Sequence, residues 1–523
     1  MCFKKARLRI ACVAAALCAW ISPAVADVRL PGLFSDNMVL QADIPVPIWG
    51  WAEPGEQVTV KVNDQVHQTS ADGSGAWRVK LQPIAAGTPL DVTISGRNTI
   101  TIQNAVAGEV WLCAGQSQIE QGMRSIKDKD THIAQADDPG LRLFVVPRTQ
   151  AQTPQADIDG QWLVCTPQNV SEVGWRGFSA IGYFFGRDLR RELDVPVGMI
   201  QSAIGGTPIE VWMSWDVLES TPAADSILQE WKRKTAGYNH ERAMQRYQQQ
   251  RARWEHDARQ AQAEGRKPPE EPKPPVPPTQ ESWYPASRYN AMIAPLAPYG
   301  MRGVLWYQGY SSRFRAEAYK TLFPLLIRSW RQLWDQGDFA FYFVQHANFA
   351  TRGKDADRQL LAAIREAQTY GLKEPNTGMV VTIDLGHSQY LHYADKRPVA
   401  TRLSNLAMSQ TYGRSGIQAH SPILREATTD GSRLLVRFEH VYDGLKAKDG
   451  QPVGGFEIAG SDQQFVPAKA EVISADTVAV WSEQVPSPVA ARYAWVDDPV
   501  DANLYNSADL PASPFRTDDW PLK

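Results

Sequence analysis

A serine on a predicted tight turn is the first residue in the chain whose setting suggests catalytic chemistry. Ser117 follows Gly115 at the end of "AVAGEVWLCAGQS", an apolar run closed by glycine that is typical of a buried strand. A serine on a sharp turn at a strand end is well placed to act as an exposed nucleophile. Gly-x-Ser alone is a weak signal, so the prediction depends on what the other strand ends carry.

Three further strand ends carry groups that a serine nucleophile needs. Gly205 and Gly206 close the run "VPVGMIQSAIGG", and glycine lets backbone N–H groups approach an oxyanion closely. Gln308 follows "GVLWY" and offers a side-chain amide donor. His392 follows a fourth run, "TGMVVTIDLG", and histidine is the usual general base for a serine hydroxyl. This order of groups on successive strand ends predicts acyl transfer.

The predicted roles follow from the residue types. Ser117 attacks an acyl carbonyl while His392 accepts its proton. We expect the backbone N–H groups of Ser117 and Gly206 to hold the oxyanion, with Gln308 as a side-chain donor. Asp384 is the nearest acid upstream of His392. Either Asp384 orients the imidazole, or the site works as a Ser–His dyad.

A parallel sheet is the element that must bring these residues together. Apolar strand candidates alternate with helical stretches such as "FSAIGYFFGRDLRREL" and "AEAYKTLFPLLIRSWRQLW". This alternation predicts an α/β core whose sheet is covered by helices on both faces. Ligands of such sheets bind at the carboxyl ends of the strands, which is where the candidate residues fall.

Shorter alternating runs flank this core on both sides. In the N-terminal part, Val58, Val60 and Val62 alternate with polar residues, the period of a half-buried strand. Runs such as "SRLLVRFEHV" and "ARYAWVDD" give the last hundred residues the same β texture. The expected organisation is a signal peptide at 1–26, an N-terminal β domain at 27–105, a catalytic core at 106–215 and 286–415, an insert at 216–285 and a C-terminal β domain at 416–523.

The insert interrupts the alternation of strands and helices. Its sequence "ERAMQRYQQQRARWEHDARQAQAEGRK" is polar and helix-prone, and it runs into the proline-rich "PPEEPKPPVPP". Residues 228–280 are therefore predicted to form a helix and an extended return leg on the rim of the domain, without catalytic residues. The alternative is a lid over the site.

The N-terminus has the pattern of a secretory signal peptide. Lys4, Lys5, Arg7 and Arg9 precede the apolar stretch 10–21, and Ala24-Val25-Ala26 has the small-x-small form of a cleavage site. No later run is long and apolar enough to cross a bilayer. We therefore expect a periplasmic or secreted protein that has no contact with the membrane after cleavage.

Charge and cysteine content exclude some function classes. The chain has a net charge of −3, and loss of the basic N-terminal segment makes it more negative, which argues against nucleic acid as a partner. Three of the five cysteines lie in the predicted signal peptide. Cys113 and Cys165 remain, and pairing or separate burial are both open. No cluster has the spacing of zinc ligands, and nothing indicates an oligomeric state.

Long segments of this sequence resemble the sialate O-acetylesterase family of SGNH hydrolases, which includes esterases acting on other acetylated sugars. The resemblance runs from about residue 30 to about residue 520 and implies a three-layer α/β/α core with β-sandwich-like accessory domains at both ends. It also implies an acetylated glycan as substrate and no metal or organic cofactor. The segments are "LFSDNMVLQADIPVPIWGWAEPGEQVTV", "GEVWLCAGQSQIE", "AIGGTPIEVWMSW", "YNAMIAPLAPYGMRGVLWYQGYSS" and "NLYNSADLPASPFRTDDW".

The resemblance assigns roles to individual residues. Ser117 matches the nucleophile of the family, Gly206 the oxyanion glycine, and His392 the histidine of a block that usually reads Asp-Ile-His-Pro. Gln308 lies in the block that usually reads Tyr-Gln-Gly-Glu-Ser-Asn. Residues in or beside these blocks are expected to contact the sugar, although packing in the core is an equal alternative for the tryptophan. They are Gln118, Trp306, Tyr310 and Ser312.

Three departures from the family pattern leave an alternative function open. Gln118 replaces an asparagine, Tyr310 and Ser312 replace an acid and an amide, and Tyr390 replaces the acid before the histidine. The alternative is a catalytically impaired, carbohydrate-binding member of the family. The sequence does not choose between sialate and plant-polysaccharide side chains as the sugar.

Overall fold

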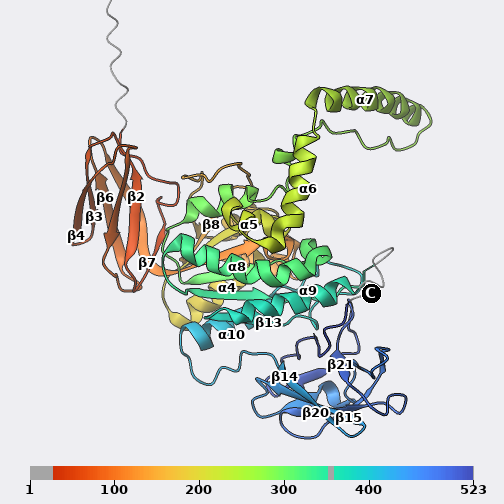
Figure 1. Ribbon diagram of the computed structural model, residues 1–523. Coiled ribbons are helices and arrows are strands. Elements are labelled where there is room, and N and C mark those ends of the chain that lie inside the picture. Colours follow the sequence, from red (N-terminus) through yellow and green to blue (C-terminus); the bar gives the residue numbers. More distant parts are fainter. Residues whose placement is uncertain (1–26, 352–358, 522–523) are drawn as a thin grey trace, which may run out of the picture.

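Seven strands form the central sheet of the computed structural model, in the order β13-β12-β11-β7-β10-β8-β9 (Figure 1). The first six are parallel, and β9 joins the edge antiparallel to β8. The structure describes residues 27–351 and 359–521, so the predicted signal peptide at 1–26 lies outside it. The strands are β7 (Thr99–Gly115), β8 (Asp138–Val145), β9 (Trp162–Cys165), β10 (Val197–Ala203), β11 (Gly303–Tyr307), β12 (Ala340–Val344) and β13 (Thr377–Val380).

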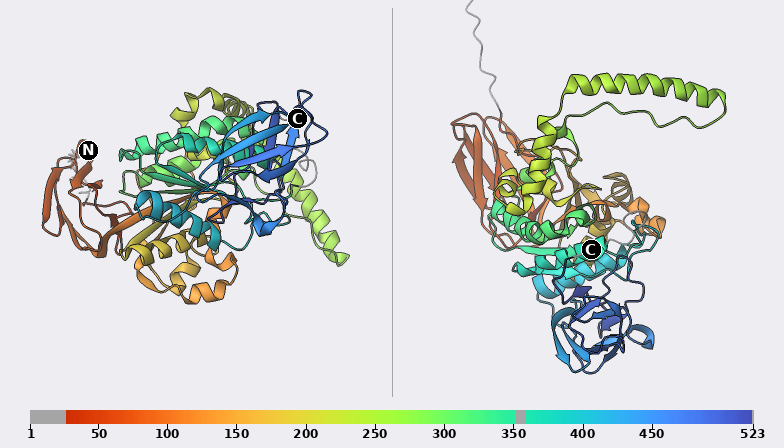
Figure 2. Two further views of the ribbon diagram at one scale, coloured as in Figure 1. Left: turned by 90° about the horizontal axis from the view of Figure 1, so that it is seen from below. Right: turned by 45° about the vertical axis from the view of Figure 1, so that its right-hand side comes forward.

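Helices cover both faces of this sheet (Figures 1 and 2). Alternate residues of β7 enter two separate cores, because successive side chains of a strand point to opposite faces. Trp111 and Cys113 pack with α4 and α10, whereas Leu112 packs with α8 and α9. The predicted mixed α/β fold is confirmed. The helices are α4 (Ala180–Leu193), α8 (Ala316–Trp334), α9 (Leu360–Thr369) and α10 (Arg397–Leu406).

The N-terminal strands are joined to the central sheet through one continuous strand. The first part of β7 pairs with β6, and residues 109–115 of the same strand pair with β10 in the central sheet. The expected domain boundary at 105/106 therefore falls inside a strand and not in a linker. The other strands are β1 (Val39–Gln41), β2 (Val46–Trp51), β3 (Gln57–Val62), β4 (Gln65–Ser70), β5 (Ala76–Leu81) and β6 (Pro89–Ser95).

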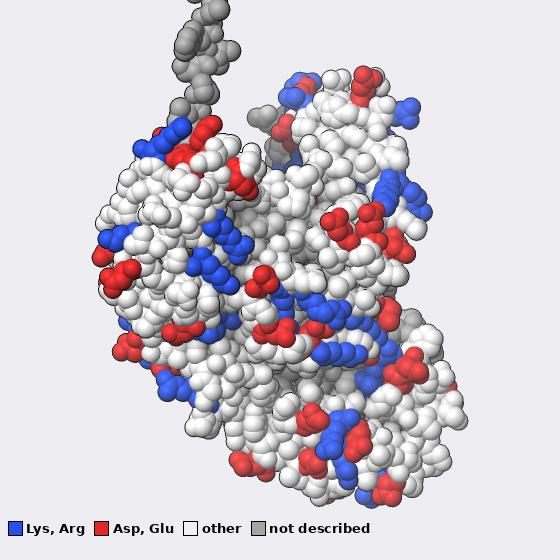
Figure 3. Space-filling view, turned by 60° about the vertical axis from the view of Figure 1, so that its left-hand side comes forward, with Lys and Arg blue, Asp and Glu red and all other residues white. Residues whose placement is uncertain are grey.

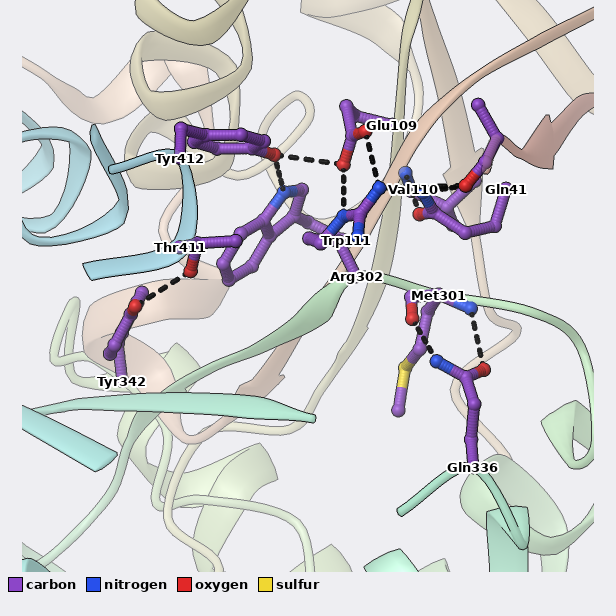
Figure 4. Close-up of polar contacts among 11 residues, drawn as sticks. Gln41, Glu109, Val110, Trp111, Met301, Arg302, Gln336, Tyr342, Thr411 and Tyr412 are labelled. Atoms are coloured by element: carbon purple, nitrogen blue, oxygen red, sulfur yellow. Dashed lines mark hydrogen bonds and ion pairs between the residues drawn. The ribbon is translucent and has the colours of Figure 1, made fainter. Parts of the chain in front are cut away.

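A polar network fixes the start of the catalytic part of β7 (Figure 4). Arg302 donates to both carboxylate oxygens of Glu109, at 2.6 and 2.8 Å. Tyr412 donates its hydroxyl to Glu109 at 2.9 Å and accepts from the indole of Trp111 at 3.0 Å. The Gln41 side chain, from the N-terminal strands, accepts the backbone N–H of Val110 at 2.8 Å. The network ties three distant segments of the chain to the strand that leads to Ser117.

The insert consists of helices and an extended return leg. α7 projects away from the core beyond α6 (Figure 1), and only Ala243 and Ala261 of its side chains are buried. The indole of Trp254 donates to the carbonyl of Pro269 at 2.9 Å, which holds the return leg along the helix. The helices are α5 (Trp215–Glu219), α6 (Asp225–Ala236) and α7 (His240–Ala263).

The C-terminal part contains two four-stranded sheets, and the segment after β21 is hydrogen-bonded to α9. Arg365 of α9 is fully buried and donates to the carbonyls of Val496 and Asp497 at 2.8 and 2.7 Å. The Asp497 carboxylate in turn accepts the backbone N–H of Leu361 at 2.8 Å. The sheets are β14 (Ile423–Asp430), β15 (Arg433–Glu439), β20 (Thr477–Trp481) and β19 (Lys469–Val472), and β18 (Val466–Pro467), β17 (Phe456–Ala459), β21 (Ala490–Tyr493) and β23 (Phe515–Arg516).

Surface charge, the lack of a membrane-spanning helix and the state of the two cysteines can be compared with the sequence predictions over the described residues. On the face seen in Figure 3, acidic and basic side chains are interspersed over the surface. Within the described ranges, no helix combines the length and apolar composition needed to cross a membrane. Cys113 and Cys165 are both buried and unpaired, so separate burial is the observed alternative.

Candidate active site

Ser117 and His392 meet at the carboxyl edge of the central sheet. The Nε2 atom of His392 lies 2.8 Å from the Oγ atom of Ser117. Ser117 opens the short helix α1 (Ser117–Glu120) directly after β7. Gly115 makes this turn possible, because its φ is +130° and a Cβ there would lie 2.4 Å from the Tyr307 carbonyl oxygen. Two residues that are 275 positions apart in the chain are thus brought to the distance that a serine nucleophile and its base require.

Buried polar contacts hold the loop that carries His392. Gln118 donates from its amide to the carbonyl of Leu391 at 2.5 Å and accepts from the buried ammonium group of Lys396. The Lys396 ammonium also lies over the Tyr393 ring, 3.8 Å from its centroid. Gln118 is only 1% exposed, so it supports the histidine loop and does not face a sugar as expected.

The surroundings of His392 favour the neutral base. Desolvation of the ring lowers the pKa of His392 below its usual 6.5, and the nearby charge of Lys396 lowers the pKa further. The imidazole must have a free Nε2 to accept the serine proton, which places its own proton on Nδ1. The lowered pKa keeps the His392 ring uncharged at lower pH than an unperturbed histidine.

A pH profile tests this electrostatic arrangement. The rate falls in acid as His392 becomes protonated, and its lowered pKa moves that fall to lower pH. We expect the acidic limb of kcat/KM for a small acetyl ester to have its midpoint below 6.5, the usual pKa of histidine. The measurement is kcat/KM from about pH 4 to about pH 8. A midpoint at or above the usual histidine pKa would contradict a lowered pKa for His392.

Asp384 does not lie where the sequence suggested. Both of its carboxylate oxygens accept from Arg402 of α10, at 2.8 and 2.7 Å, and neither bonds to His392. The bidentate ion pair satisfies the carboxylate and directs it away from the imidazole ring. Tyr390, at the usual position of the acid, is 62% exposed. Among the residues that the structure covers, no carboxylate contacts the His392 ring, which leaves the dyad.

The Asp384→Asn variant separates the dyad from a triad. Loss of a triad acid lowers kcat by about 10⁴-fold. Because Asp384 pairs with Arg402, we expect a loss of less than about threefold in kcat, together with a lower melting temperature. Steady-state kinetics and thermal melting measure the two effects. A loss of several orders of magnitude in a variant that melts normally would restore the triad.

The glycine turn after β10, where the sequence predicts the oxyanion donors, lies beside Ser117. Gly206 has a φ of +75° and lines the cavity beside Ser117. The backbone N–H of Gly205 donates to the buried carboxylate of Glu120 at 2.6 Å, and Glu120 also pairs with Arg148 at 3.0 Å. Burial raises the pKa of Glu120, while Arg148 opposes that rise. Glu120 thus fixes the glycine turn against the helix that begins at Ser117.

Three other predicted contacts lie in the interior. The Gln308 amide is completely buried and donates to the Thr207 carbonyl at 3.2 Å and to Ser312 Oγ at 3.0 Å, so it does not reach the oxyanion position as expected. Ser312 uses its hydroxyl in the same internal network. Trp306 is 1% exposed and packs edge-on against other tryptophans of the core. Of the four expected sugar contacts, Tyr310 lies on the cavity wall.

A cavity of about 450 Å³ opens directly above the serine and the histidine. Two partly exposed indole rings border it, Trp175 at 36% and Trp283 at 47% exposure. Neither tryptophan could be predicted as a site residue, because each lies in an irregular loop without a motif. Flat aromatic faces of this kind suit the apolar faces of sugars. The cavity is lined by Gln116, Ser117, Glu120, Arg148, Trp175, Gly205, Gly206, Trp283, Tyr310, Ser311, Arg313, Leu391 and His392.

His346 lies behind the wall of the cavity, next to Tyr310. His346 is buried, donates from Nδ1 to the Ala347 carbonyl at 2.8 Å and stacks on Tyr310. Burial lowers the pKa of His346 to about 3, so it stays neutral and supports the cavity wall.

In the part of the chain that the structure describes, no group of three or more His, Cys, Asp or Glu side chains is arranged to hold a metal.

Comparison with known proteins gives matches over nearly the whole chain. Residues 279–407 match the family model of carbohydrate esterases described as sialic acid-specific acetylesterases. The sialate O-acetylesterase of Rattus norvegicus is 29% identical over 93% of this chain and 94% of its own length, and that of Homo sapiens is 27% identical over 93% and 92%. A carbohydrate acetylesterase from Xanthomonas citri is 33% identical, covers 94% of this chain and 100% of its own, and superimposes with a TM-score of 0.78.

Proposed function

Because this chain belongs to the sialate O-acetylesterase family of carbohydrate esterases, we propose that it removes acetyl groups from glycan hydroxyls through a serine acyl-enzyme. Membership makes the chain a carboxylic ester hydrolase. The observation that carries the serine mechanism is the 2.8 Å distance between Ser117 Oγ and His392 Nε2, at the floor of an open cavity. The proposed fold class is the SGNH hydrolase, with its helices on both faces of a parallel sheet.

Acylation is the first half of the proposed reaction. Ser117 Oγ attacks the acetyl carbonyl carbon while His392 Nε2 takes the hydroxyl proton. In this mechanism the backbone N–H groups of Ser117 and Gly206 donate to the developing oxyanion. When the tetrahedral intermediate collapses, the bond between the carbonyl carbon and the sugar oxygen breaks. His392 then delivers its proton to the departing sugar hydroxyl.

Deacylation repeats these steps with water. His392 removes a proton from a water molecule, which attacks the acetyl-serine carbonyl. The second tetrahedral intermediate expels Ser117 Oγ, which regains its proton from the imidazolium, and acetate leaves. Without a carboxylate on the ring, Gln118 and the histidine loop that it holds keep the imidazole in place.

Location follows from the N-terminal sequence. We propose that the enzyme acts in the periplasm or outside the cell, on glycans encountered there. The basic segment, the short apolar stretch and the Ala-Val-Ala sequence support this proposal.

Acetate release from a panel of O-acetylated glycans tests the proposed function. The panel contains O-acetylated sialic acid, acetylated xylan and acetylated xyloglucan, each incubated with the wild-type enzyme. We expect acetate from at least one glycan, and the preferred one identifies the sugar. Binding to a glycan without any acetate release, in a protein that also fails to turn over p-nitrophenyl acetate, would favour the catalytically impaired alternative.

A further inference from the structure

A second cavity lies next to the active-site cavity and is formed jointly by the core and the insert. Its volume is about 580 Å³. The core contributes the segment 148–150 and Arg288, and the return leg of the insert contributes Val276 and the segment 280–282. The extended, proline-rich leg of the insert therefore forms one wall of a cavity beside the active site.

The two cavities share a border. Arg148 lines both of them, and it reaches the active-site cavity through its ion pair with Glu120 at 3.0 Å. On the opposite wall, Ser282 lines the second cavity and its neighbour Trp283 lines the first. The two cavities therefore lie side by side, with Arg148 between them.

Two residues that line the second cavity, Gln150 and Arg288, carry polar atoms that lack partners among the residues described. The Oε1 atom of Gln150 and the Nε atom of Arg288 are buried and have no hydrogen-bond partner among the residues described. Arg288 is only 8% exposed, and its Nη1 donates to the Thr149 carbonyl at 2.6 Å, which fixes the guanidinium. Buried polar groups are normally hydrogen-bonded, so an unused acceptor and an unused donor on two residues that line one cavity point to a ligand with hydroxyl groups.

Two of the three charged side chains that line this cavity form ion pairs, and the third is Arg288. Arg148 pairs with Glu120, and Glu281 pairs with Lys234 at 2.5 Å. Recognition here therefore relies on hydrogen bonds to neutral hydroxyls more than on net charge. Sugar hydroxyls both donate and accept, which matches the pair formed by Gln150 and Arg288.

We propose that the second cavity is an outer subsite, which binds unesterified sugar units of the glycan chain whose acetylated unit occupies the Ser117 cavity. The proposal rests on the proposed esterase function and makes the natural substrate an oligosaccharide or polysaccharide. The insert then serves to close one wall of the outer subsite. Remote binding of this kind raises the rate at the reacting centre when it positions the ester.

Chain-length dependence tests the outer subsite. Acetate release is measured for O-acetylated sialyl and O-acetylated xylose oligosaccharides of one to four units. In the series whose monosaccharide is hydrolysed, we expect kcat/KM to rise by about tenfold between one unit and three or four units. A kcat/KM that is independent of chain length would overturn the proposal.

Two matched glutamine variants locate the effect. Gln150 and Gln152 both tie the core segment to the insert, through the Gln280 carbonyl at 2.5 Å and Thr279 Oγ1 at 3.4 Å, but only Gln150 lines the cavity. We expect Gln150→Ala to lose about threefold to tenfold in kcat/KM on the longest oligosaccharide and nothing on p-nitrophenyl acetate. Gln152→Ala should keep both activities. Equal losses in the two variants would overturn the assignment, because they would show that the attachment of the insert to the core matters and that the position of Gln150 in the cavity does not.

A binding measurement separates this proposal from the proposed function. The unesterified tetrasaccharide is titrated into the Ser117→Ala protein, in which the subsite is intact and the nucleophile is gone. Binding that weakens with Gln150→Ala in that background supports the subsite even if no acetate is ever released. Hydrolysis of small esters without tetrasaccharide binding overturns the subsite and leaves the esterase standing.

Discussion

The Ser117→Ala variant is expected to lose deacetylation by about 10⁶-fold in kcat, the scale seen when a serine hydrolase loses its nucleophile. Ser117 Oγ lies 2.8 Å from the base, in the wall of the cavity and at the end of a rigid strand. Removing one hydroxyl deletes the bond-forming atom and leaves the packing around it unchanged. The rate is measured with p-nitrophenyl acetate and with the preferred glycan.

Folding controls make this result specific. Ser117→Ala should keep the circular dichroism spectrum and melting temperature of the wild type. Ser125→Ala removes a nearby hydroxyl that has no hydrogen-bond partner within the described structure, so it should keep nearly full activity. If Ser117→Ala retained more than about a tenth of the wild-type rate, a serine acyl-enzyme could not be the mechanism.

Loss of His392 is expected to have an effect of similar size, and the two losses should not add. A nucleophile and its base act as a unit, so removing either removes the function of both. We expect His392→Ala to lower kcat by several orders of magnitude, and Ser117→Ala/His392→Ala to be no slower than Ser117→Ala alone. Pre-steady-state measurement of the acetyl-enzyme would show no acyl accumulation in any of the three.

Additive losses would give a different picture. If the double variant were slower than Ser117→Ala by the full effect of His392→Ala, the histidine would act independently of the serine. Such a result would point to a base that activates water directly. The short distance between the two side chains predicts the opposite.

The position of the central site could be predicted from the sequence because local patterns identify buried strands and the residues at which they end. The apolar runs before Ser117, Gly206 and Gln308 identify buried strands, and parallel strands bring their carboxyl ends to one edge. His392 could be added because it follows the last such strand. These inferences need only the period and the end of each element.

The direction of individual side chains could not be predicted in this way. Asp384 turns to Arg402, which lies 18 residues later on α10, and Gln308 turns inward to Ser312. Local periodicity does not show which buried cation or hydroxyl a polar side chain will find. Trp175 and Trp283 reach the cavity from irregular segments, where no period exists to indicate their direction.

The continuity of β7 has a mechanical consequence. A single strand begins in the N-terminal sheet, passes through the Glu109 network and ends two residues before Ser117. A hinge needs a segment that can bend without breaking hydrogen bonds, and β7 pairs with neighbours at both of its ends. The N-terminal sheet is therefore connected to the active site through one strand that is hydrogen-bonded at both ends. The orientation of that sheet therefore sets the direction in which the Ser117 cavity opens.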